Sequence, residues 1–462
     1  MKTIFIVVSR GFIIRNVLRS GVLQFIKEAG CRVIVLLQVR KGKQVPEYLE
    51  KEFCDEQTLI EAVEGPHEGK WYERLYRFFV LKTSLLVYSD STWSYSRAGN
   101  INNRQRMPFW AYLEKFIFSI LTHFHFLKSI TRVLERKVFL TDFYVEYFNK
   151  YQPDLVFTTS VISAIDIAFM KEAARRGIKT ASMTKGWDHT TRVLYRFIPD
   201  KIIVQNSIMK ECLFKYQRIN REMVSVCGFP QFDWYVHKEL LIDRTEYISS
   251  LGLDPKKRLI FFGSEGAWAP KDDLIAEILA KYINTPGVLV NPASLIIRPH
   301  FSDAKGNRFD RFRGLHNIVV DDKIDYSDAL PGGWDPGFNE IKHFVNLMYH
   351  SDVVINIAST LTLDACCFDK PIIAVDFGVL HNLRNGRDVT NVYYEMDHYQ
   401  DVLKTGAVDL VKNEKELLHS INDYLIHPER NQAARKILLD KLCYKVDGNS
   451  SRRIAKEILS LL

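Results

Sequence analysis

Short runs of consecutive apolar residues alternate with longer amphipathic stretches in two parts of the chain. Runs such as LIFF and VVINI are almost continuously apolar, which is typical of strands covered on both faces. Strands and helices that alternate in this way predict parallel sheets with helices on both sides. We expect strands at residues 4–9, 32–37, 154–159, 179–184, 201–205 and 223–228, and again at residues 258–263, 294–299, 317–321, 352–357 and 371–375.

The pattern divides the chain into two doubly wound, Rossmann-like α/β domains. Helical patterns lie between the strands, at residues 11–29, 164–176, 208–216, 272–282, 339–350 and 362–367. A Gly-Phe-Pro turn followed by a polar stretch predicts a domain boundary. We therefore expect a first domain over residues 1–235, a linker over 236–254 and a second domain over 255–462. Two such domains face each other across a cleft at the carboxyl ends of their strands, where open α/β sheets bind ligands.

Residues 49–144 break the alternation and predict a helical, aromatic-rich insertion in the first domain. It contains WYERLYRFFVL and FWAYLEKFIFSIL. One interpretation is a helical lid packed on the first sheet. The alternative is an amphipathic hairpin that makes peripheral contact with an anionic membrane. Glu114 and Lys115 interrupt its most apolar stretch, so we predict no transmembrane helix. The apolar run at residues 4–8 is too short for a signal peptide and predicts a buried strand.

Composition and charge narrow the class of protein. A length of 462 residues suits two domains, and 47% hydrophobic with 26% charged residues is typical of a soluble globular chain. The net charge of +8 fits an anionic ligand or a membrane surface equally. The basic residues are dispersed and form no recognition motif, so we expect no nucleic-acid partner. Seven scattered cysteines without metal-ligand spacing predict free thiols in a cytoplasmic compartment and no metal site.

The turn after the strand at residues 352–357 carries the strongest candidate site. Ser359 and Thr360 open a helix there, so their hydroxyls and free backbone N–H groups form a potential anion site. Asp364 lies one turn further, where its carboxylate can accept hydrogen bonds from a ribose. The structural alternative is simple N-capping by Ser359 and a solvated Asp364.

Two further strand ends in the second domain suit phosphate. Gly263 and Ser264 end the first strand, where a small turn lets the backbone approach a phosphate closely. Arg298 ends the next strand and can clamp a phosphate with two hydrogen bonds, while His300 can donate to an oxyanion. The alternative pairs Arg298 with a carboxylate such as Asp303 and leaves His300 in solvent.

In the first domain, the segment after residues 179–184 brings together a lysine, an aspartate and a histidine. Lys185, Asp188 and His189 surround a flexible glycine at a strand end, and either Asp188 or His189 can act as a general base. The alternative is a structural loop with Trp187 in the core. The motifs GxGxxG, GxxxxGK[ST], HExxH and GxSxG are absent, which removes support for a dehydrogenase, a P-loop enzyme, a zinc protease or a serine hydrolase.

The second half of the chain resembles the nucleotide-binding half of the GT-B superfamily. The resemblance rests on MYHSDVV, AST and KPII between residues 348 and 373, and on the ending DGNSSRRIA at residues 447–455. The superfamily includes nucleotide-sugar glycosyltransferases, glycerophosphotransferases with a CDP-linked donor, and non-hydrolysing epimerases of UDP-N-acetylglucosamine. The triplet RPH at residues 298–300 is similar to the glycerophosphotransferase branch. The resemblance covers about residues 255–462, and the first half follows by architecture alone.

The resemblance implies a metal-independent glycosyltransferase of surface polysaccharide synthesis. The second domain would hold a nucleotide-activated sugar, which is a substrate, so no cofactor is expected. The first domain would bind a glycan or lipid-linked acceptor, with Arg10, Gly11 and Lys185 on the acceptor side and Asp188 or His189 as base. This places the enzyme in the cytoplasm, with membrane association at the inner face as an option. The alternatives are polyol-phosphate transfer from a CDP-linked donor, sugar-nucleotide epimerisation, and a non-catalytic nucleotide-binding protein.

Overall fold

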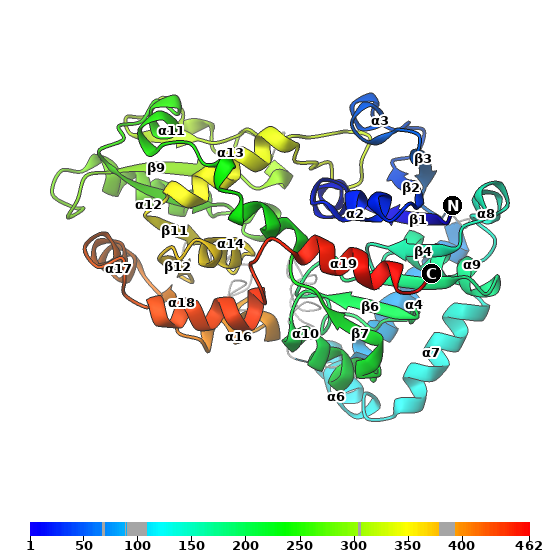
Figure 1. The fold of residues 1–462 in the computed structure, drawn as a ribbon. Helices are drawn as coiled ribbons and strands as arrows, with labels where there is room; N and C mark the ends of the chain where they lie inside the picture. The colour runs from blue at the N-terminus through cyan, green and yellow to red at the C-terminus, as the bar shows by residue number, and fades with distance from the viewer. Residues whose placement is uncertain (67–69, 88, 90–108, 304–305, 378–392) are drawn as a thin grey trace.

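The computed structural model describes residues 1–462 except 67–69, 88, 90–108, 304–305 and 378–392 (Figure 1). Its first sheet has seven parallel strands in the order β3-β2-β1-β4-β5-β6-β7. These strands are β1 (Thr3–Val8), β2 (Arg32–Val39), β3 (Thr58–Glu64), β4 (Leu155–Thr158), β5 (Lys179–Met183), β6 (Lys201–Val204) and β7 (Val224–Val226).

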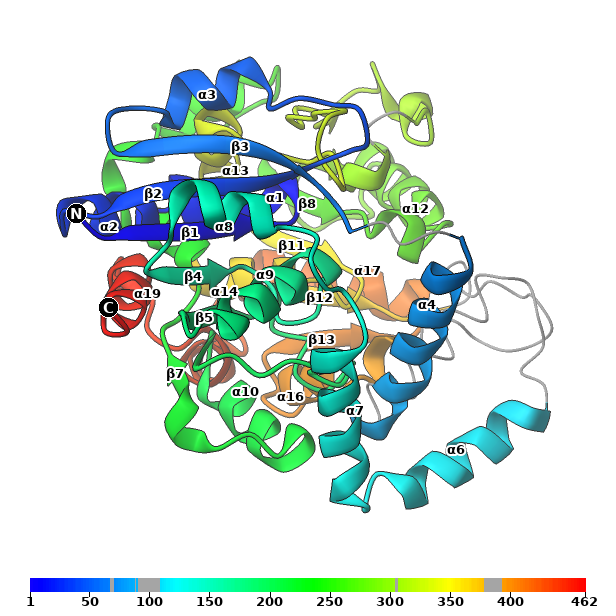
Figure 2. The same ribbon diagram turned by 90° about the vertical axis from the view of Figure 1, so that its right-hand side faces the viewer.

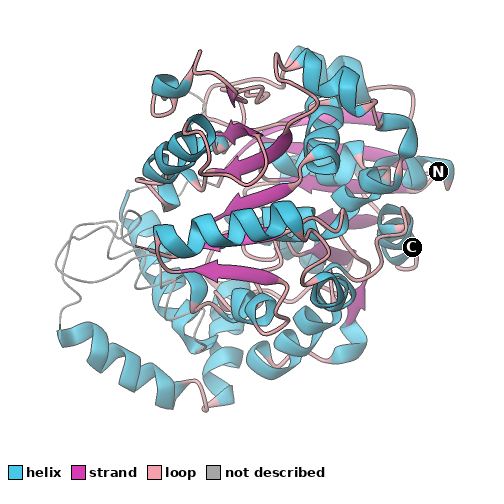
Figure 3. Cartoon of the chain, turned by 90° about the vertical axis from the view of Figure 1, so that its left-hand side faces the viewer, coloured by secondary structure: helices cyan, strands magenta, loops and turns pink. Residues whose placement is uncertain are grey.

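The second sheet has six parallel strands in the order β10-β9-β8-β11-β12-β13. They are β8 (Arg258–Gly263), β9 (Ala293–Arg298), β10 (Ile318–Val320), β11 (Val353–Asn356), β12 (Ile372–Val375) and β13 (Val408–Val411). Helices cover both faces of each sheet (Figure 3). The prediction of two doubly wound domains from almost continuously apolar strands is therefore confirmed.

Helices connect most successive strands, as is usual for parallel pairing, whereas residues 184–200 join β5 to β6 without a helix. The helices are α1 (Gly11–Ile13), α2 (Val22–Glu28), α3 (Glu47–Phe53), α4 (Lys70–Ser84), α6 (Phe109–Leu121), α7 (His125–Lys137), α8 (Val145–Tyr151), α9 (Ala164–Arg175), α10 (Ser207–Cys212), α11 (Arg244–Ser250), α12 (Asp273–Asn284), α13 (Phe338–His350), α14 (Leu361–Cys367), α16 (Asp397–Leu403), α17 (Glu414–Ile426), α18 (Gln432–Leu438) and α19 (Ser450–Leu459).

Strands β3 and β13 lie outside the predicted strand ranges. Both are sheet edges, and β3 in the sequence TLIEAVE exposes Leu59 and carries two glutamates, so it lacks the apolar run that marks a central strand. The expected insertion over residues 49–144 is therefore wrong at its start, because residues 58–64 belong to the first sheet. Its helical part is α4, α6 and α7, and its residues 67–69, 88 and 90–108 lie outside the described residues.

The C-terminal helix α19 returns to the first domain. Figure 1 shows it beside α2, and its Ile454 and Ile458 are buried in the core of the first sheet. The carboxylate of Asp233 accepts hydrogen bonds from the backbone of Ser450 at 2.9 Å and Ser451 at 2.7 Å, which fixes the start of the helix. The range 255–462 is thus not a single packing unit, since its last ten or so residues stabilise the other domain.

A loop of the second domain also crosses to the first. Asp335 accepts hydrogen bonds from Arg19 Nη1 at 2.5 Å and from the hydroxyl of Tyr48 at 2.6 Å. The backbone N–H of Arg40 donates to the carbonyl of Ala329 at 2.8 Å. These contacts and α19 hold the carboxyl edges of the two sheets opposite each other.

The helices α4, α6 and α7 lie together at one edge of the first domain (Figure 2). Tyr72, Tyr76 and Phe79 of α4 pack on the core of the first sheet, as a lid would. The side chain of Lys82 on α4 forms an ion pair with Glu114 on α6. Throughout the described part of the chain, no helix combines the length and the hydropathy needed to cross a bilayer.

Candidate functional site

A cavity of about 340 Å³ lies between the two sheets, at the carboxyl ends of β5, β8, β9 and β11. This is the edge at which open α/β sheets bind ligands. The structure brings ten of the sequence-predicted residues into its wall. They are Lys185, Asp188, His189, Gly263, Ser264, Arg298, His300, Ser359, Thr360 and Asp364.

Arg10 and Gly11 are outside the wall of this cavity. The loop around Trp334 covers their turn: a Cβ on Gly11 would lie 2.3 Å from the carbonyl oxygen of Trp334. The backbone N–H of Gly11 donates to the carbonyl of Pro331 at 3.4 Å, and Arg10 is exposed. Glycine at this position therefore permits the close approach of the two domains. The neighbouring Arg15 and Asn16 line the cavity instead.

Arg298 is buried and doubly paired. Its Nη1 lies 2.5 Å from Asp321 and its Nη2 lies 2.5 Å from Glu340. Burial alone would raise the pKa of Asp321, but the charge of Arg298 lowers it to about 2. As the alternative predicts, Arg298 pairs with carboxylates. The suggested partner Asp303 is wrong, because Asp303 pairs with Arg308. The guanidinium therefore has no unused fork for a phosphate.

The turn after β8 is built around two close contacts. Strand pairing sets Gly263 beside Arg298, and a Cβ on Gly263 would lie 2.1 Å from Cδ1 of Leu361. The hydroxyl of Ser264 accepts a hydrogen bond from Arg308 Nη2 at 2.9 Å. Glycine at this position thus lets α14 pack on β8, and Arg308 is a cation near the cavity that sequence reasoning missed.

His300 is neutral in this environment. Burial lowers its pKa to about 4. Its Nδ1 accepts a hydrogen bond from the backbone N–H of Ser302 at 3.1 Å, so the ring proton is on Nε2. A neutral Nε2–H is a hydrogen-bond donor, which fits the predicted contact with an oxyanion.

The start of α14 joins the two domains. The indole Nε1–H of Trp187 donates to the hydroxyl of Thr360 at 3.3 Å. Asp364 is buried and accepts a hydrogen bond from the hydroxyl of Tyr235 at 2.5 Å, and burial raises the pKa of Asp364 to about 6. The solvated Asp364 of the structural alternative is therefore wrong, and one of its oxygens is already engaged by Tyr235.

Glu265 is a cavity residue with an unusual carboxyl group. Burial raises its pKa to about 8, although a hydrogen bond from Ser359 opposes the change. Its Oε2 has no hydrogen-bond partner among the residues that the structure describes. The sequence signal was only its place after Gly263 and Ser264 at a strand end.

Replacing Glu265 by glutamine is expected to stabilise the protein at pH 8 more than at pH 5. The folded carboxyl holds its proton up to about pH 8, whereas the unfolded one loses it near pH 4.5. Stability therefore falls as the pH rises through this window, and glutamine removes the loss. Urea unfolding at both pH values should show that the variant gains more free energy of unfolding at pH 8 than at pH 5, by more than about 1 kcal/mol. The exposed Glu277→Gln is the control, and a pH-independent difference at position 265 would contradict the assignment.

Asp188 and His189 lie at the opposite wall of the cavity, and His398 lines a neighbouring smaller cavity together with Asp188. The carboxylate of Asp188 forms an ion pair with Arg192, which lowers the pKa of Asp188 well below its ordinary value against the effect of burial. Nε2 of His189 lies 3.7 Å from Oδ1 of Asp188. Burial lowers the pKa of His189 and of His398 to about 4, and the Nδ1 of each ring lacks a hydrogen-bond partner in the described part of the chain.

Only one of these two histidines lines the main cavity. His189 does, whereas His398 stands against the indole of Trp187, with ring centroids 4.6 Å apart, in a smaller cavity of about 210 Å³. Lys185 also lines the main cavity, and burial lowers its pKa to about 8. The cavity wall thus offers a neutral imidazole beside a lysine and a carboxylate. Across the described residues, no group of three or more His, Cys, Asp or Glu side chains is arranged to hold a metal ion.

Two facing parallel sheets with a site between their carboxyl edges define a protein of the GT-B fold. The family model described as CDP-Glycerol:Poly(glycerophosphate) glycerophosphotransferase matches residues 165–460, more than half of the sequence. The chain belongs to this family and is a transferase. The cavity-lining residues from Lys185 to Asp364 lie within the matched residues, whereas Arg15 and Asn16 precede them.

Three solved structures illustrate the likeness in fold. S. aureus MnaA with UDP has 11% identity and a TM-score of 0.56, with 100% of this chain and 98% of that chain covered. The wall teichoic acid polymerase TagF soaked with CDPG has 12% identity and a TM-score of 0.53, with 99% of this chain and 88% of that chain covered. UDP-GlcNAc 2-epimerase from Neisseria meningitidis bound to UDP-GlcNAc has 12% identity and a TM-score of 0.51, with 100% of both chains covered. A search of curated proteins gives no match.

Proposed function

We propose that the protein transfers a polyol phosphate from a CDP-linked donor to a hydroxyl group of a polymer or lipid-linked acceptor. The family match over residues 165–460 carries this proposal, because it includes the cavity-lining residues from Lys185 to Asp364. The principal expectation from the sequence is sugar transfer. The family supports its coarser part, transfer from a nucleotide-activated donor, and does not support a sugar as the transferred group. The polyol-phosphate alternative, which the triplet at residues 298–300 suggested, is the finer statement we adopt.

In the proposed reaction, the acceptor oxygen attacks the phosphorus that carries the polyol. A new P–O bond forms, the bond to the bridging oxygen of the diphosphate breaks, and CMP leaves. The acceptor proton must go to a base, and a neutral imidazole at His189 can take it. The negative charge of the bound donor raises the pKa of a nearby imidazole, which makes His189 a stronger base once the donor is bound.

Asp188 is better placed to assist His189 than to act as the base. Its ion pair with Arg192 holds it ionised with a strongly lowered pKa, so it accepts a proton poorly. At 3.7 Å from Nε2 of His189, its charge stabilises the imidazolium that forms. Of the two candidates the sequence left open, we choose His189.

Two cations and a donor N–H group can compensate the charge of the diphosphate. Lys185 lines the cavity and, with a pKa of about 8, is largely protonated at pH 7. Arg15 lines the same wall, its guanidinium 5.1 Å from the ring centroid of Trp334. The Nε2–H of neutral His300 adds a hydrogen bond from the second domain. Fixed donors and charges of this kind stabilise the negative charge that develops on the leaving phosphate.

Calorimetric titration tests the choice of donor. We expect CDP-glycerol to bind at least about tenfold more tightly than UDP-GlcNAc, a difference of about 1.4 kcal/mol. CDP and UDP, which differ only in the base, serve as matched controls for its contribution. Tighter binding of UDP-GlcNAc would contradict the proposal and favour sugar transfer or epimerisation. Binding of none of these compounds would favour the non-catalytic alternative.

A further inference from the structure

Glu265 stands at the junction of two cavities. It lines the main cavity of about 340 Å³ and also the smaller one of about 210 Å³ that contains His398. Among the described residues, Trp187, Asp188, Glu265 and Thr360 line both cavities. Two of these four residues come from each domain. The side chain of Glu265 is therefore part of the wall between the cavities, where the two domains face each other.

The turn that carries Glu265 is fixed by hydrogen bonds and by a close contact. The backbone N–H of Glu265 donates to Asp272 Oδ2 at 2.7 Å. The backbone N–H of Gly266 donates to the hydroxyl of Ser264 at 3.1 Å. Gly266 has a φ of +63°, and a Cβ at this position would lie 2.7 Å from Nδ1 of His300. Glycine thus lets the turn pack on the loop of His300, which keeps Glu265 close to that histidine.

Glu265 has no cation as its partner in the described part of the chain. Cations beside its neighbours are already paired: Arg308 lies 2.9 Å from Asp272, and Arg192 forms an ion pair with Asp188. Burial raises the pKa of Glu265 to about 8, and the charges of Asp272 and Asp188 act in the same direction. At neutral pH the side chain is therefore a carboxylic acid, which has an O–H group to donate.

Asp188 and Glu265 are two carboxyl groups in opposite protonation states across one cavity. Burial opposes the ionisation of Asp188, but Arg192 lowers its pKa well below the ordinary value. Carboxyl pairs whose surroundings separate their pKa values in this way are typical of sites that divide acid and base roles. In the proposed reaction the base role belongs to His189 beside Asp188, which leaves the acid side of the site to Glu265.

The diphosphate of a bound donor matches what the wall offers. Phosphate oxygens accept hydrogen bonds, and the same cavity already presents the cations Arg15 and Lys185 and the Nε2–H of His300. Oε2 of Glu265 is buried and has no hydrogen-bond partner among the described residues. A buried polar group without a partner costs free energy, and a phosphate oxygen that accepts its hydrogen bond removes that cost.

We propose that Glu265 acts as a carboxylic acid that donates a hydrogen bond to the diphosphate of the bound donor. The proton stays on Glu265 throughout: the acceptor oxygen attacks phosphorus, its own proton goes to His189, and CMP leaves with its new charge hydrogen-bonded to the carboxyl group. A donor held where negative charge develops lowers the barrier to reaction. This inference rests on the proposed function only in requiring a nucleoside diphosphate group in the cavity.

Proton uptake on nucleotide binding tests the proposal without turnover. At about pH 8.5 most of the free protein has lost the Glu265 proton, and the negative diphosphate should restore it. Calorimetric titrations with CDP and with UDP, each in two buffers of different ionisation enthalpy, count the protons taken up. Glu265→Gln keeps an N–H donor but cannot ionise. The wild type should take up about half a proton or more per nucleotide beyond this variant.

The other titratable groups that face Glu265 keep one charge state near pH 8.5, apart from a lysine and an aspartate. The histidines are neutral because burial lowers their pKa to about 4, the tyrosines keep their protons because burial raises their pKa, and the arginines stay charged. They are His189, His300, His398, Tyr394, Tyr399, Arg192 and Arg308.

Lys185 and Asp272 titrate in the same range as Glu265. Burial lowers the pKa of Lys185 to about 8 and raises that of Asp272 to about 7. Both residues remain in Glu265→Gln, so the difference between this variant and the wild type reports position 265. Lys185→Met should bind CDP more weakly, and adding Glu265→Gln to it should still lower the proton uptake.

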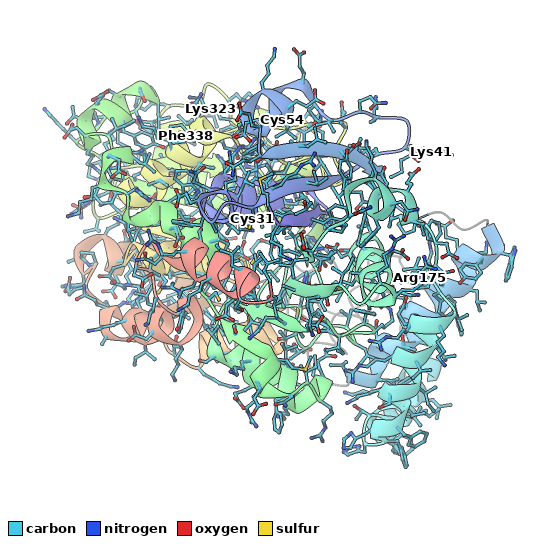
Figure 4. The ribbon with its side chains drawn as sticks, turned by 45° about the vertical axis from the view of Figure 1, so that its right-hand side comes forward. Cys31, Lys41, Cys54, Arg175, Lys323 and Phe338 are labelled. Atoms are coloured by element: carbon cyan, nitrogen blue, oxygen red, sulfur yellow. The ribbon has the colours of Figure 1, made fainter. Side chains whose placement is uncertain are left out.

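Two exposed residues supply the matched controls. Glu277→Gln on α12 removes a surface glutamate, and Lys41→Met removes a surface lysine. Figure 4 labels Lys41 at the outer surface of the first domain. Both variants should bind nucleotide and take up protons as the wild type does.

Rates of transfer from CDP-glycerol test the role of the hydrogen bond. The kcat/KM of the wild type should fall as the pH rises through about 8, where the carboxyl group loses its proton. Glu265→Gln should stay within about tenfold of the wild type at pH 7, and the ratio of its kcat/KM to that of the wild type should rise about tenfold between pH 7 and pH 9. Glu265→Ala has no donor and should be about 10²–10³-fold slower than the wild type at pH 7.

Equal proton uptake by the wild type and Glu265→Gln would overturn the proposal, as would a Glu265→Gln variant as slow as Glu265→Ala at pH 7. Thermal unfolding midpoints no lower than that of the wild type show that the variants are folded. Binding of UDP but not CDP, with the expected difference in uptake, would support the role of Glu265 and contradict the CDP-linked donor. Binding of CDP without that difference would do the reverse, and binding of neither nucleotide would overturn both.

Discussion

Replacing His189 by alanine is expected to lower the rate of transfer by about 10²–10⁴-fold, the usual contribution of a general base. Donor affinity should stay close to that of the wild type, because the proposed role of His189 is to take the acceptor proton. Steady-state rates with donor titrations measure the two effects separately. The base must be deprotonated, and the pKa of free His189 is about 4, so kcat/KM should be flat near neutral pH and fall as the pH drops towards 4.

His398→Ala is the matched control for this variant. Its imidazole has the same lowered pKa and an Nδ1 that no described residue bonds, but it lies outside the main cavity. We expect its rate to stay within about tenfold of the wild type, less than removal of a general base costs. A large loss in His398→Ala with an active His189→Ala would move the base to His398. Full activity in both would place the base elsewhere.

Replacing Arg298 by alanine is expected to reduce the free energy of unfolding by about 3–5 kcal/mol, since it leaves two buried carboxylates without their cation. Asp321 and Glu340 each lie 2.5 Å from the guanidinium. Because Arg298 holds the pKa of Asp321 at about 2, this contribution is present above the ordinary carboxyl pKa and is lost as the pH falls towards 2. Urea unfolding of the variant measures the loss.

Arg258→Ala is the control for a surface pair. Arg258 begins the neighbouring strand and its Nη1 lies 3.0 Å from Asp352, but its side chain is exposed, so the change should cost less than about 1 kcal/mol. The combined variant Arg298→Ala, Asp321→Asn, Glu340→Gln should regain part of the stability, because no buried charge is left unpaired. If Arg298→Ala is as stable as the wild type but binds the nucleotide more weakly, the original prediction of a phosphate clamp stands.

Central strands could be read from the sequence because burial on both faces leaves an almost continuous apolar run. Strands β8 and β11 are of this kind, and every residue of β11 is buried. Edge strand β3 has a glutamate after each pair of apolar residues, and this weaker pattern within a helical, aromatic region was missed. The packing of α19 on α2 was also missed, because the sequence of an amphipathic helix shows which of its faces is buried but not which sheet that face packs on.

The site was predictable where its residues follow strands, and unpredictable where their partners come from elsewhere. Lys185, Gly263 and Arg298 stand at the carboxyl ends of β5, β8 and β9, so topology alone brings them together. Glu340 follows Arg298 by 42 residues and pairs with it through a tertiary contact that no spacing reveals. In the same way, glycine is required at position 11 because the loop around Trp334 packs against it, and this loop is more than 300 residues away in the sequence.

The nucleotide released from CDP-glycerol tests the central claim most directly. The protein is incubated with CDP-glycerol and a polymer or lipid-linked acceptor, and the nucleotide products are separated and quantified. Attack at phosphorus predicts CMP in equal amount to the glycerol phosphate joined to the acceptor, and both products formed at least about a hundredfold more slowly with His189→Ala. Release of CDP, which requires cleavage at carbon, or turnover only with a UDP-sugar and release of UDP, would contradict polyol-phosphate transfer.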